Sequence, residues 1–227
     1  MSFIVNNTTI LNPLDLIAPH SCRGCGCLGE PLCERCKNNI ITSHKNLCPK
    51  CKKEKSTPIC PNCKELPPIY TLGIRKGLLA SLIHDYKYSS NRALAAVFAD
   101  LLDSTLPPLP PNTFLIPLPT ASHHIRARAL DHTAKIAKKL AKKRHLKMQK
   151  LLLRAKNTVQ VGSDRTTRLS QAKEAYVVNP TIPIDESATY ILFDDVWTTG
   201  ASLLSATKKL REAGASNIII IVLAISD

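Results

Sequence analysis

The sequence predicts an α/β protein, in which a parallel sheet is flanked by helices and preceded by a small cysteine-rich domain. Two wholly apolar runs, residues 190–193 and 218–225, suit strands that are buried on both faces of a parallel sheet. All nine cysteines lie within residues 22–63. This change in composition predicts a boundary between a lead-in plus cysteine-rich domain, residues 1–65, and an α/β domain, residues 66–227.

The bulk composition favours an ordinary globular protein. The chain has 227 residues, of which 44% are hydrophobic. No apolar segment reaches the roughly 18 residues that a membrane span needs. The first residues lack the basic start and the apolar stretch of a secretory signal. We therefore expect a cytoplasmic protein, in which cysteines bind metal more often than they form disulfides.

Eight of the nine cysteines form four C-x-x-C pairs. Each pair presents two thiolates at a spacing that tetrahedral Zn²⁺ accepts, and two pairs complete a site with four ligands. Four pairs predict two zinc ions in a double zinc ribbon, where the metal stabilises the fold and does not catalyse. Redox chemistry is the disfavoured alternative. The predicted zinc ligands are Cys22, Cys25, Cys33, Cys36, Cys48, Cys51, Cys60 and Cys63.

Two features of the metal sites stay open at this point. Pairing in chain order is the simplest arrangement, and a cross-braced arrangement, in which the first pair joins the third, is the alternative. Cys27 is the ninth cysteine and could replace Cys25 as a ligand.

The segment after the cysteines predicts a strand followed by helices. A linker at residues 66–68 precedes a strand at residues 69–76 and a helical region at residues 78–102, which is interrupted near residues 89–91. Apolar residues recur at helical spacing on both sides of the interruption. They form two stripes, Leu79, Leu82, Ile83 and Tyr86, and then Leu94, Val97, Phe98, Leu101 and Leu102.

A core strand and a basic helix come next. Residues 114–116 predict the first core strand, after a proline-rich bend. A long helix is predicted over residues 128–147, with its lysines facing solvent and an apolar face turned to the sheet. That apolar face consists of Leu130, Ala134, Ala137 and Leu140.

Positive charge is concentrated in and after this helix. The chain carries a formal net charge of +14, and no acidic residue lies between Asp131 and Asp164. Such an acid-free run indicates a polyanionic partner such as a nucleic acid. The alternative is that the lysines form an ordinary solvated helix face. The residues predicted to bind nucleic acid are Lys135, Lys138, Lys139, Lys142, Lys143, Arg144, Lys147, Arg154 and Lys156.

Residues 151–178 predict a mobile basic insertion. They contain few apolar anchors, and loops of this length in compact domains are usually functional or disordered. Beside a phosphate site, such a loop would close as a lid over pyrophosphate. A disordered surface loop is the alternative. The predicted lid residues are Gln160, Arg165 and Arg168.

Residues 190–202 predict the binding site. The apolar run ends at Asp194 and Asp195, and a turn rich in hydroxyl groups leads into a helix that stops near Gly214. The start of a helix offers free N–H groups and a positive dipole end to a phosphate. The two carboxylates can accept hydrogen bonds from vicinal hydroxyls of a ribose. The predicted apolar face of the helix consists of Leu203, Ala206, Thr207 and Leu210.

A nucleotide-hydrolysing Walker B strand is the rival interpretation of this acid pair. It requires a Gly-Lys-Ser/Thr phosphate loop elsewhere in the chain. None of the eight glycines is followed by lysine, so this interpretation fails.

The stretch resembles the phosphoribosyltransferases that bind phosphoribosyl pyrophosphate (PRPP). Their signature is a hydrophobic strand, Asp-Asp and a Thr-(Thr/Ser)-Gly-x-(Thr/Ser) turn. The resemblance implies a type I phosphoribosyltransferase-like fold, with Asp194 and Asp195 on the ribose hydroxyls and magnesium bound with PRPP. The implied phosphoribose-binding residues are Asp194, Asp195, Val196, Trp197, Thr198, Thr199, Gly200, Ala201 and Ser202. The implied pyrophosphate loop is Pro117, Leu118, Pro119, Thr120 and Ala121.

Nearly the whole chain resembles the ComF family of competence proteins. The resemblance is carried by the double zinc ribbon, by residues 84–88, by residues 116–119, by the predicted lid and PRPP motif, and by the turn at residues 213–215. It implies a cytoplasmic protein that binds incoming single-stranded DNA in natural transformation. It also implies a competence helicase as a protein partner.

The chain departs from that family at the start of the basic helix. The family commonly shows Arg-Gly-Phe-Asn-Gln where residues 128–132 are Arg-Ala-Leu-Asp-His, and Gln171 stands where the family has a small polar residue. Catalytic residues stay unassigned. Trp197 could stack on a base, although a lone tryptophan more often packs in the core. The alternatives to DNA handling are a transferase that passes phosphoribose from Mg-PRPP to an amine or base, and a zinc-ribbon adaptor for a helicase.

Overall fold

The computed structural model describes residues 20–42, 47–88, 93–119, 131–155 and 175–226. None of the helices in these ranges combines the length and the apolar sequence that crossing a bilayer requires. The helices are α2 (Glu34–Thr42), α3 (Gly77–Tyr88), α4 (Leu94–Thr105), α6 (His132–Arg144) and α8 (Ala201–Glu212). The strands are β1 (His20–Ser21), β2 (Leu28–Gly29), β3 (Ile69–Thr71), β4 (Thr113–Pro117), β5 (Lys147–Met148), β6 (Leu152–Arg154), β7 (Tyr176–Val178), β8 (Thr189–Trp197) and β9 (Asn217–Ile225).

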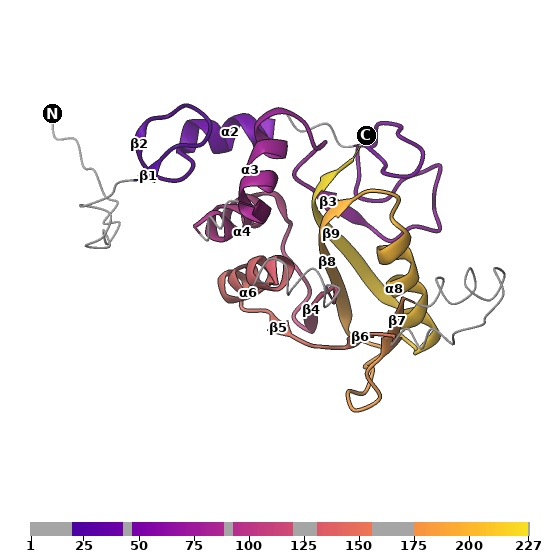
Figure 1. The fold of residues 1–227 in the computed structure, drawn as a ribbon. Coiled ribbons are helices and arrows are strands. Elements are labelled where there is room, and N and C mark those ends of the chain that lie inside the picture. The colour runs from indigo at the N-terminus through magenta and orange to yellow at the C-terminus, as the bar shows by residue number, and fades with distance from the viewer. Residues whose placement is uncertain (1–19, 43–46, 89–92, 120–130, 156–174, 227) are drawn as a thin grey trace, which may run out of the picture.

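A five-stranded parallel sheet forms the centre of the fold (Figure 1). Its strands lie in the order β3-β9-β8-β4-β5, and each neighbouring pair is parallel. The two apolar runs of the sequence form the neighbouring strands β8 and β9, whose register pairs Tyr190 with Ile218. Both strands are buried over most of their length. The predicted α/β class, with a parallel sheet flanked by helices, is confirmed.

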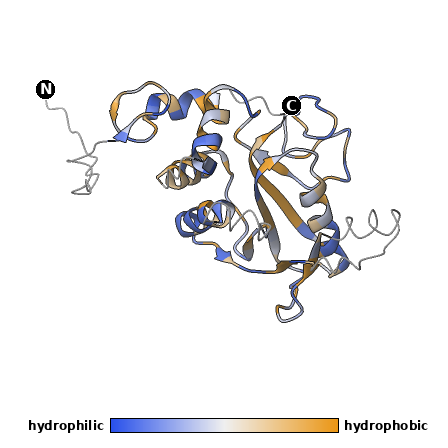
Figure 2. Ribbon diagram, viewed as in Figure 1, coloured by the Kyte–Doolittle hydropathy of each residue, from blue (hydrophilic) through white to orange (hydrophobic). Residues whose placement is uncertain are grey.

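Helices α3, α4 and α6 cover one face of this sheet. They pack against alternate strand residues such as Leu115, Ile191 and Phe193. Both predicted apolar stripes are confirmed, because every residue of the two stripes is buried. In Figure 2 the central strands are largely apolar, whereas α6 carries many hydrophilic residues.

The other face is covered by α8, the β6–β7 ribbon and the second cysteine segment, residues 47–66. On this second face of the sheet lie Ile116, Tyr190 and Leu192, which alternate along the strands with the residues of the first face. The predicted face of α8 is confirmed, since its buried residues are Leu203, Ala206, Thr207 and Leu210.

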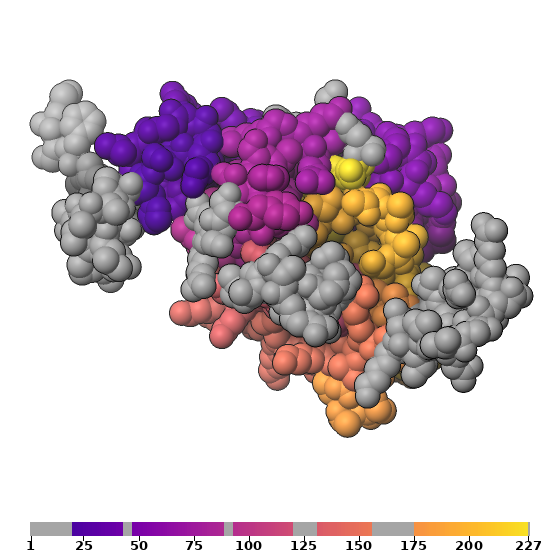
Figure 3. All heavy atoms as spheres, viewed as in Figure 1, coloured from indigo at the N-terminus to yellow at the C-terminus, as the bar shows by residue number. Residues whose placement is uncertain are grey.

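The two cysteine segments lie on opposite sides of the molecule. Cys22 and Cys36 belong to the same apolar cluster as α3 and α4. Cys48 and Cys60 belong to the cluster that contains α8. Figure 3 shows the first segment against the helices and the second beside the carboxyl end of the chain. Each cysteine segment therefore packs into a different one of the two apolar clusters.

The basic helix is shorter than predicted. Helix α6 begins at His132 because the side chain of Asp131 caps it and accepts a hydrogen bond from the Ala134 backbone N–H at 3.0 Å. It ends at Arg144, since His145 takes a left-handed conformation. Ala134 is only half-buried, and Ile136 joins the buried face instead. Leu130 lies outside the described residues.

The predicted insertion is ordered at its two ends. Strands β6 and β7 pair as an antiparallel ribbon, in which Leu152 lies opposite Val178. Leu151, Leu152 and Tyr176 are buried in the core beside α8. The prediction that residues 151–178 stand apart from the core is therefore wrong for these ends. The predicted lid residues Gln160, Arg165 and Arg168 lie outside the described residues.

Candidate functional site

The acid pair lies near the carboxyl end of β8, beside the carboxyl end of β4. Phe193 pairs with Pro117, and the backbone N–H of Leu118 donates to the Phe193 carbonyl at 2.9 Å. From β4 the chain passes to β5 on one side, whereas from β8 it passes to β9 on the other. Ligands of open α/β sheets bind at such a switch point, outside the carboxyl ends of the strands.

Strand β8 continues through the acid pair to Trp197, rather than ending at the carboxylates. Asp194 is half-buried. Burial, and after it the neighbouring charge of Asp195, raise the pKa of its carboxyl to about 7. The backbone N–H of Asp195, which donates to Asp194 Oδ1 at 2.8 Å, opposes this shift, as does Lys87. At neutral pH the Asp194 carboxyl is thus partly protonated.

Lys87 on α3 is a site residue that sequence reasoning did not assign. Its Nζ forms an ion pair with Asp195 Oδ2, and the two side chains keep only 15% and 19% of their exposure. The sequence signal is its place directly after Tyr86, the last buried residue of the α3 stripe. A lysine at this position of α3 lies beside the carboxyl end of β8.

Tyr86 joins the start of α6 to this corner of the site. Its hydroxyl donates to the His132 carbonyl at 2.9 Å, and its ring meets that of His132 edge-on. Burial raises the pKa of Tyr86, with smaller contributions from Asp131 and Asp195. The phenol is therefore a neutral donor that fixes α6 against α3.

The turn after β8 forms the second half of the site. Thr198, Thr199 and Ala201 are exposed, and Ser202 at the start of α8 is half-buried. The Thr199 hydroxyl accepts a hydrogen bond from the Ala201 N–H at 3.3 Å. Three residues with hydroxyl groups and a helix N-terminus thus follow the acid pair directly in the chain. This set of donors suits an oxyanion such as a phosphate.

Gly200 and Trp197 shape this turn. Gly200 adopts a positive φ of 76° and precedes α8 directly. A Cβ atom at this position would lie 2.2 Å from the Trp197 ring. Trp197 itself is buried in the core. Its ring therefore supports the turn from below and is not available to stack on a base.

The turn is also tied to the second cysteine segment. The backbone N–H of Ser226 donates to the Trp197 carbonyl at 2.7 Å. Lys52, which follows Cys51, donates through Nζ to the Ser226 carbonyl at 2.7 Å. The loop that carries Cys51 thus contacts the strand end that supports the turn.

Two groups of four thiols fit two structural zinc sites, and the cysteines pair in chain order. Zinc takes four thiolates in tetrahedral geometry. In each group the sulfur atoms all lie within 4.8 Å of one another. Site 2 matches the predicted ligands. Site 1 groups Cys22, Cys25 and Cys33 with Cys27, where Cys36 was predicted. The groups are Cys22, Cys25, Cys27 and Cys33 for site 1, and Cys48, Cys51, Cys60 and Cys63 for site 2.

The basic residues of α6 fall into two sets. Lys138, Lys139 and Lys142 are exposed along one side of the helix, and Lys135 is half-buried. Lys147 in β5 is also exposed. The second set is Lys143, which is also exposed but forms ion pairs, and Arg144, which is half-buried.

Aspartates on α4 compensate this second set. Lys143 Nζ lies 3.2 Å from Asp100 and 3.6 Å from Asp103. Arg144 Nε donates to Asp103 at 2.5 Å, and its guanidinium also donates to three backbone carbonyls. Arg144 therefore fastens α6 to the end of α4.

Arg154 connects the β6–β7 ribbon to the predicted pyrophosphate loop. Its Nε donates to the Pro119 carbonyl at 3.2 Å, and its guanidinium lies 5.6 Å from the centre of the Tyr176 ring. Thr120, Ala121 and Lys156 lie outside the described residues.

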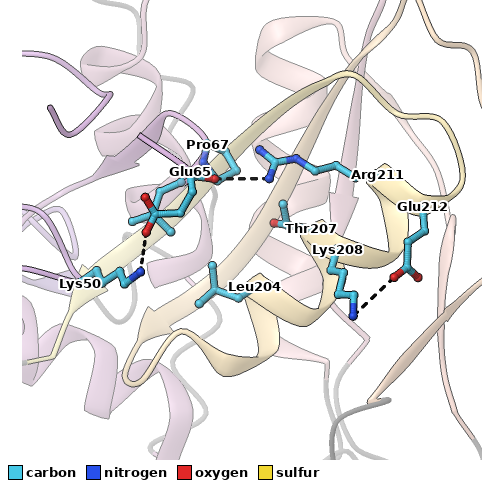
Figure 4. A pocket seen from close by; sticks show the side chains of 9 residues that line it. Lys50, Glu65, Pro67, Leu204, Thr207, Lys208, Arg211 and Glu212 are labelled. Atoms are coloured by element: carbon cyan, nitrogen blue, oxygen red, sulfur yellow. Dashed lines mark hydrogen bonds and ion pairs between the residues drawn. The ribbon is translucent and has the colours of Figure 1, made fainter. Parts of the chain in front are cut away.

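A pocket of about 390 Å³ lies between site 2 and α8 (Figure 4). Leu66 and Leu204 contribute apolar surface, and paired charges lie around it. Lys50 pairs with Glu65, and Arg211 donates to the Glu65 carbonyl at 3.3 Å. Its lining on α8 runs from Leu204 to Glu212 and includes neither residue of the acid pair.

Comparison with protein-family models gave no match for this chain, and comparison with curated proteins gave none either. The functional interpretation therefore depends on the geometry and chemistry of the sites.

Proposed function

We propose that this chain is a ComF-type protein with a type I phosphoribosyltransferase-like domain, which binds a phosphorylated ribose and single-stranded DNA in the cytoplasm during natural transformation. The observation that carries the proposal is the meeting of an acid pair and a hydroxyl-rich helix start at the switch point of a parallel sheet. Acceptors for vicinal hydroxyls and donors for a phosphate are what a ribose 5-phosphate group requires.

In this proposal, Asp194 and Asp195 accept hydrogen bonds from the sugar. The turn from Thr198 to Ser202 wraps the 5′-phosphate, and the backbone after β4 faces a pyrophosphate if the ligand is PRPP. Magnesium would then neutralise the pyrophosphate. Because Lys87 already pairs with Asp195, we expect the phosphates of the ligand, and not the acid pair, to supply most of the ligands of the ion.

Calorimetric titration with PRPP and with ribose 5-phosphate, each with and without magnesium, tests this site. We expect binding by the wild-type protein, and a loss of at least tenfold in affinity in Thr199→Ala and in Asp195→Asn. Thr57→Ala, far from the turn, serves as the matched control. If the wild-type protein binds neither PRPP nor ribose 5-phosphate, the phosphoribose proposal is overturned.

The DNA proposal is supported by the exposed lysines of α6. Replacing Lys138, Lys139 and Lys142 by glutamine should weaken binding of a labelled single-stranded oligonucleotide. It should also lower the slope of log affinity against log salt by about 2, since each phosphate contact contributes about 0.7. A triple variant with the same charge change, at Lys53, Lys64 and Lys208, should keep the wild-type slope. Equal slopes for the two variants, or no binding by the wild-type protein, would contradict the proposal.

An active transferase is the second candidate, and the raised pKa of Asp194 favours it, because a carboxyl with a pKa of about 7 can exchange a proton at neutral pH. Such an enzyme would release pyrophosphate from Mg-PRPP in the presence of an amine or base. Asp195→Asn should abolish this release. Binding of PRPP without release for any acceptor class would favour the DNA-handling protein.

A further inference from the structure

Site 1 has five cysteine thiols for four ligand positions. Residues 20–42 contain Cys22, Cys25, Cys27, Cys33 and Cys36. A tetrahedral thiolate zinc site accommodates four ligands. One of the five thiols must therefore lie outside the first coordination sphere at any moment. Site 2, by contrast, has four cysteines and no fifth.

Three thiols of site 1 lie near both Cys27 and Cys36: they belong to the four-thiol group that contains Cys27, and they also interact with Cys36. Cys25 Sγ lies 3.6 Å from Cys33 Sγ. Cys22 Sγ accepts hydrogen bonds from the backbone N–H groups of Gly24, at 3.4 Å, and of Cys33, at 3.3 Å. These bonds fix the Cys22 sulfur between the two halves of the site. Cys22, Cys25 and Cys33 thus form a fixed triad.

Cys27 approaches this triad from the solvent side. Its sulfur lies 3.4 Å from that of Cys25 and within 4.8 Å of all three sulfurs of the triad. Cys27 is exposed and lies just before β2.

Cys36 approaches the triad from the protein side. It is 5% exposed, packs in the apolar cluster of α3 and α4, and interacts with the side chains of Cys33, Cys22 and Cys25. A Cβ atom on Gly24 would lie only 2.6 Å from its sulfur. The absence of a side chain at Gly24 is what allows Cys36 to lie directly beneath the first pair.

We propose that Cys22, Cys25 and Cys33 hold the zinc of site 1 permanently, and that Cys27 and Cys36 exchange at the fourth position. In the exchange, the incoming thiol releases its proton to solvent as its sulfur binds the zinc, and the leaving thiolate takes up a proton from solvent. The zinc therefore keeps four thiolate ligands in both states. With Cys36 bound, the Cys27 thiol is released to solvent. With Cys27 bound, Cys36 returns to the apolar cluster. Site 1 is thereby a zinc site with an exchangeable surface thiol, whereas site 2, whose Cys48, Cys60 and Cys63 are buried, is closed.

Native mass spectrometry of zinc-loaded single and double variants tests this proposal. We expect two zinc ions in the wild-type protein, in Cys27→Ser and in Cys36→Ala, and one in the double variant. Cys60→Ser, which breaks site 2, should also hold one and serves as the control for a lost site. A single zinc ion in folded Cys27→Ser or in folded Cys36→Ala would overturn the proposal, because it would make that residue an obligatory ligand.

Alkylation of the wild-type protein is a second, independent test, which does not require Cys36→Ala to fold. The zinc-loaded chain is treated with N-ethylmaleimide, and the labelled residue and the zinc content are read together by mass spectrometry. We expect Cys27 to be labelled first with both zinc ions retained, at a rate at least threefold below that of N-acetylcysteine. Loss of a zinc ion with the first label would make Cys27 an obligatory ligand. Labelling as fast as N-acetylcysteine would make Cys27 a thiol that never binds the metal. Either result overturns the exchange.

Discussion

The Nζ atom of Lys87 forms an ion pair with the Oδ2 atom of Asp195, and this contact joins the end of α3 to the acid pair of β8. Lys87 also lowers the pKa of Asp194, and so it opposes the effects of burial and of Asp195. One lysine thus interacts with two adjacent carboxyl groups that are distant from it in the sequence. The contact lies at the carboxyl end of β8, where Lys87 and Asp195 have little exposure to water.

Replacing Lys87 by methionine should therefore destabilise the fold. Breaking a buried pair costs about 3–5 kcal/mol, and the partial exposure of this pair reduces the expected loss to about 2 kcal/mol. Urea unfolding at pH 7 in zinc-containing buffer measures the change. Lys142→Met, at an exposed position of α6, should change the free energy of unfolding by less than about 0.5 kcal/mol. Equal stabilities of the two variants would show that the ion pair contributes nothing.

Asp194 should make the stability of the protein fall as the pH rises towards neutrality. Its pKa is raised from the ordinary value of 3.8 to about 7 in the folded protein, chiefly by burial. Between these values the folded state holds a proton that the unfolded state has released. The contribution is complete below about pH 4 and is lost as the pH rises through 7.

Comparison of the wild-type protein with Asp194→Asn isolates this contribution. From pH 5.5 to pH 8, the wild-type protein should lose about 2 kcal/mol relative to the variant, since one pKa unit corresponds to about 1.4 kcal/mol. Urea unfolding at the two pH values gives both numbers. Glu186→Gln, an exposed carboxyl beside β8, should follow the wild-type protein. Parallel pH profiles for wild type and Asp194→Asn would mean that Asp194 is ionised throughout.

The features that the sequence predicted well depend on local periodicity or on close spacing. The stripe from Leu79 to Tyr86 and the buried face of α8 follow from the helical repeat, because each helix packs on only one side. The burial of β8 up to Phe193 follows from an uninterrupted apolar run. Four C-x-x-C pairs gave two thiol groups, since ligands that are close in sequence need little help from the fold.

The features that it missed depend on contacts between distant segments. Nothing near Lys87 indicates that Asp195 is its partner, because their proximity requires the end of α3 to lie beside the carboxyl end of β8, the middle strand of the sheet. Arg144 has the same composition signal as its lysine neighbours, yet its partners lie on and after α4. The helix start at His132 did have a local signal, the capping residue Asp131, which is polar and so does not contribute to the apolar periodicity. The first thiol group contains Cys27 where Cys36 was predicted. This difference depends on the packing of α2, which places Cys36 in the apolar cluster.

Gly200 should be indispensable for the turn that carries the predicted phosphate site. Alanine there would have to adopt a positive φ, at a cost of about 1–2 kcal/mol, and would meet the Trp197 ring at 2.2 Å. Overpacking adds about 1–3 kcal/mol. We expect Gly200→Ala to lower the free energy of unfolding by about 2–5 kcal/mol.

Gly77 is the matched control, because replacing it by alanine tests the cost of a positive φ without overpacking. It has a positive φ of 51° at the start of α3, and a Cβ atom there would meet nothing within 4 Å. Gly77→Ala should therefore cost only about 1–2 kcal/mol. Urea unfolding and near-ultraviolet circular dichroism of the single tryptophan report stability and the Trp197 environment together. The packing argument fails if the two variants lose the same stability and Gly200→Ala keeps the wild-type tryptophan signal.

Arg144 should behave as a structural residue, although it belongs to the basic run that was predicted to bind nucleic acid. Its guanidinium binds the Asp103 carboxylate and the carbonyls of Asp103, Leu106 and Pro107. Hydrogen bonds to charged groups contribute about 1.5–3 kcal/mol, so Arg144→Gln should lose about 2 kcal/mol of stability. Lys142→Gln, on the exposed side of the same helix, should leave stability within about 0.5 kcal/mol of wild type. Titrations with a single-stranded oligonucleotide, at a salt concentration that weakens wild-type binding by more than half, compare the affinities of the two variants. There Lys142→Gln should weaken binding more than folded Arg144→Gln, the reverse of their order in stability. The opposite order would mean that Arg144 leaves its carbonyl partners to contact the DNA.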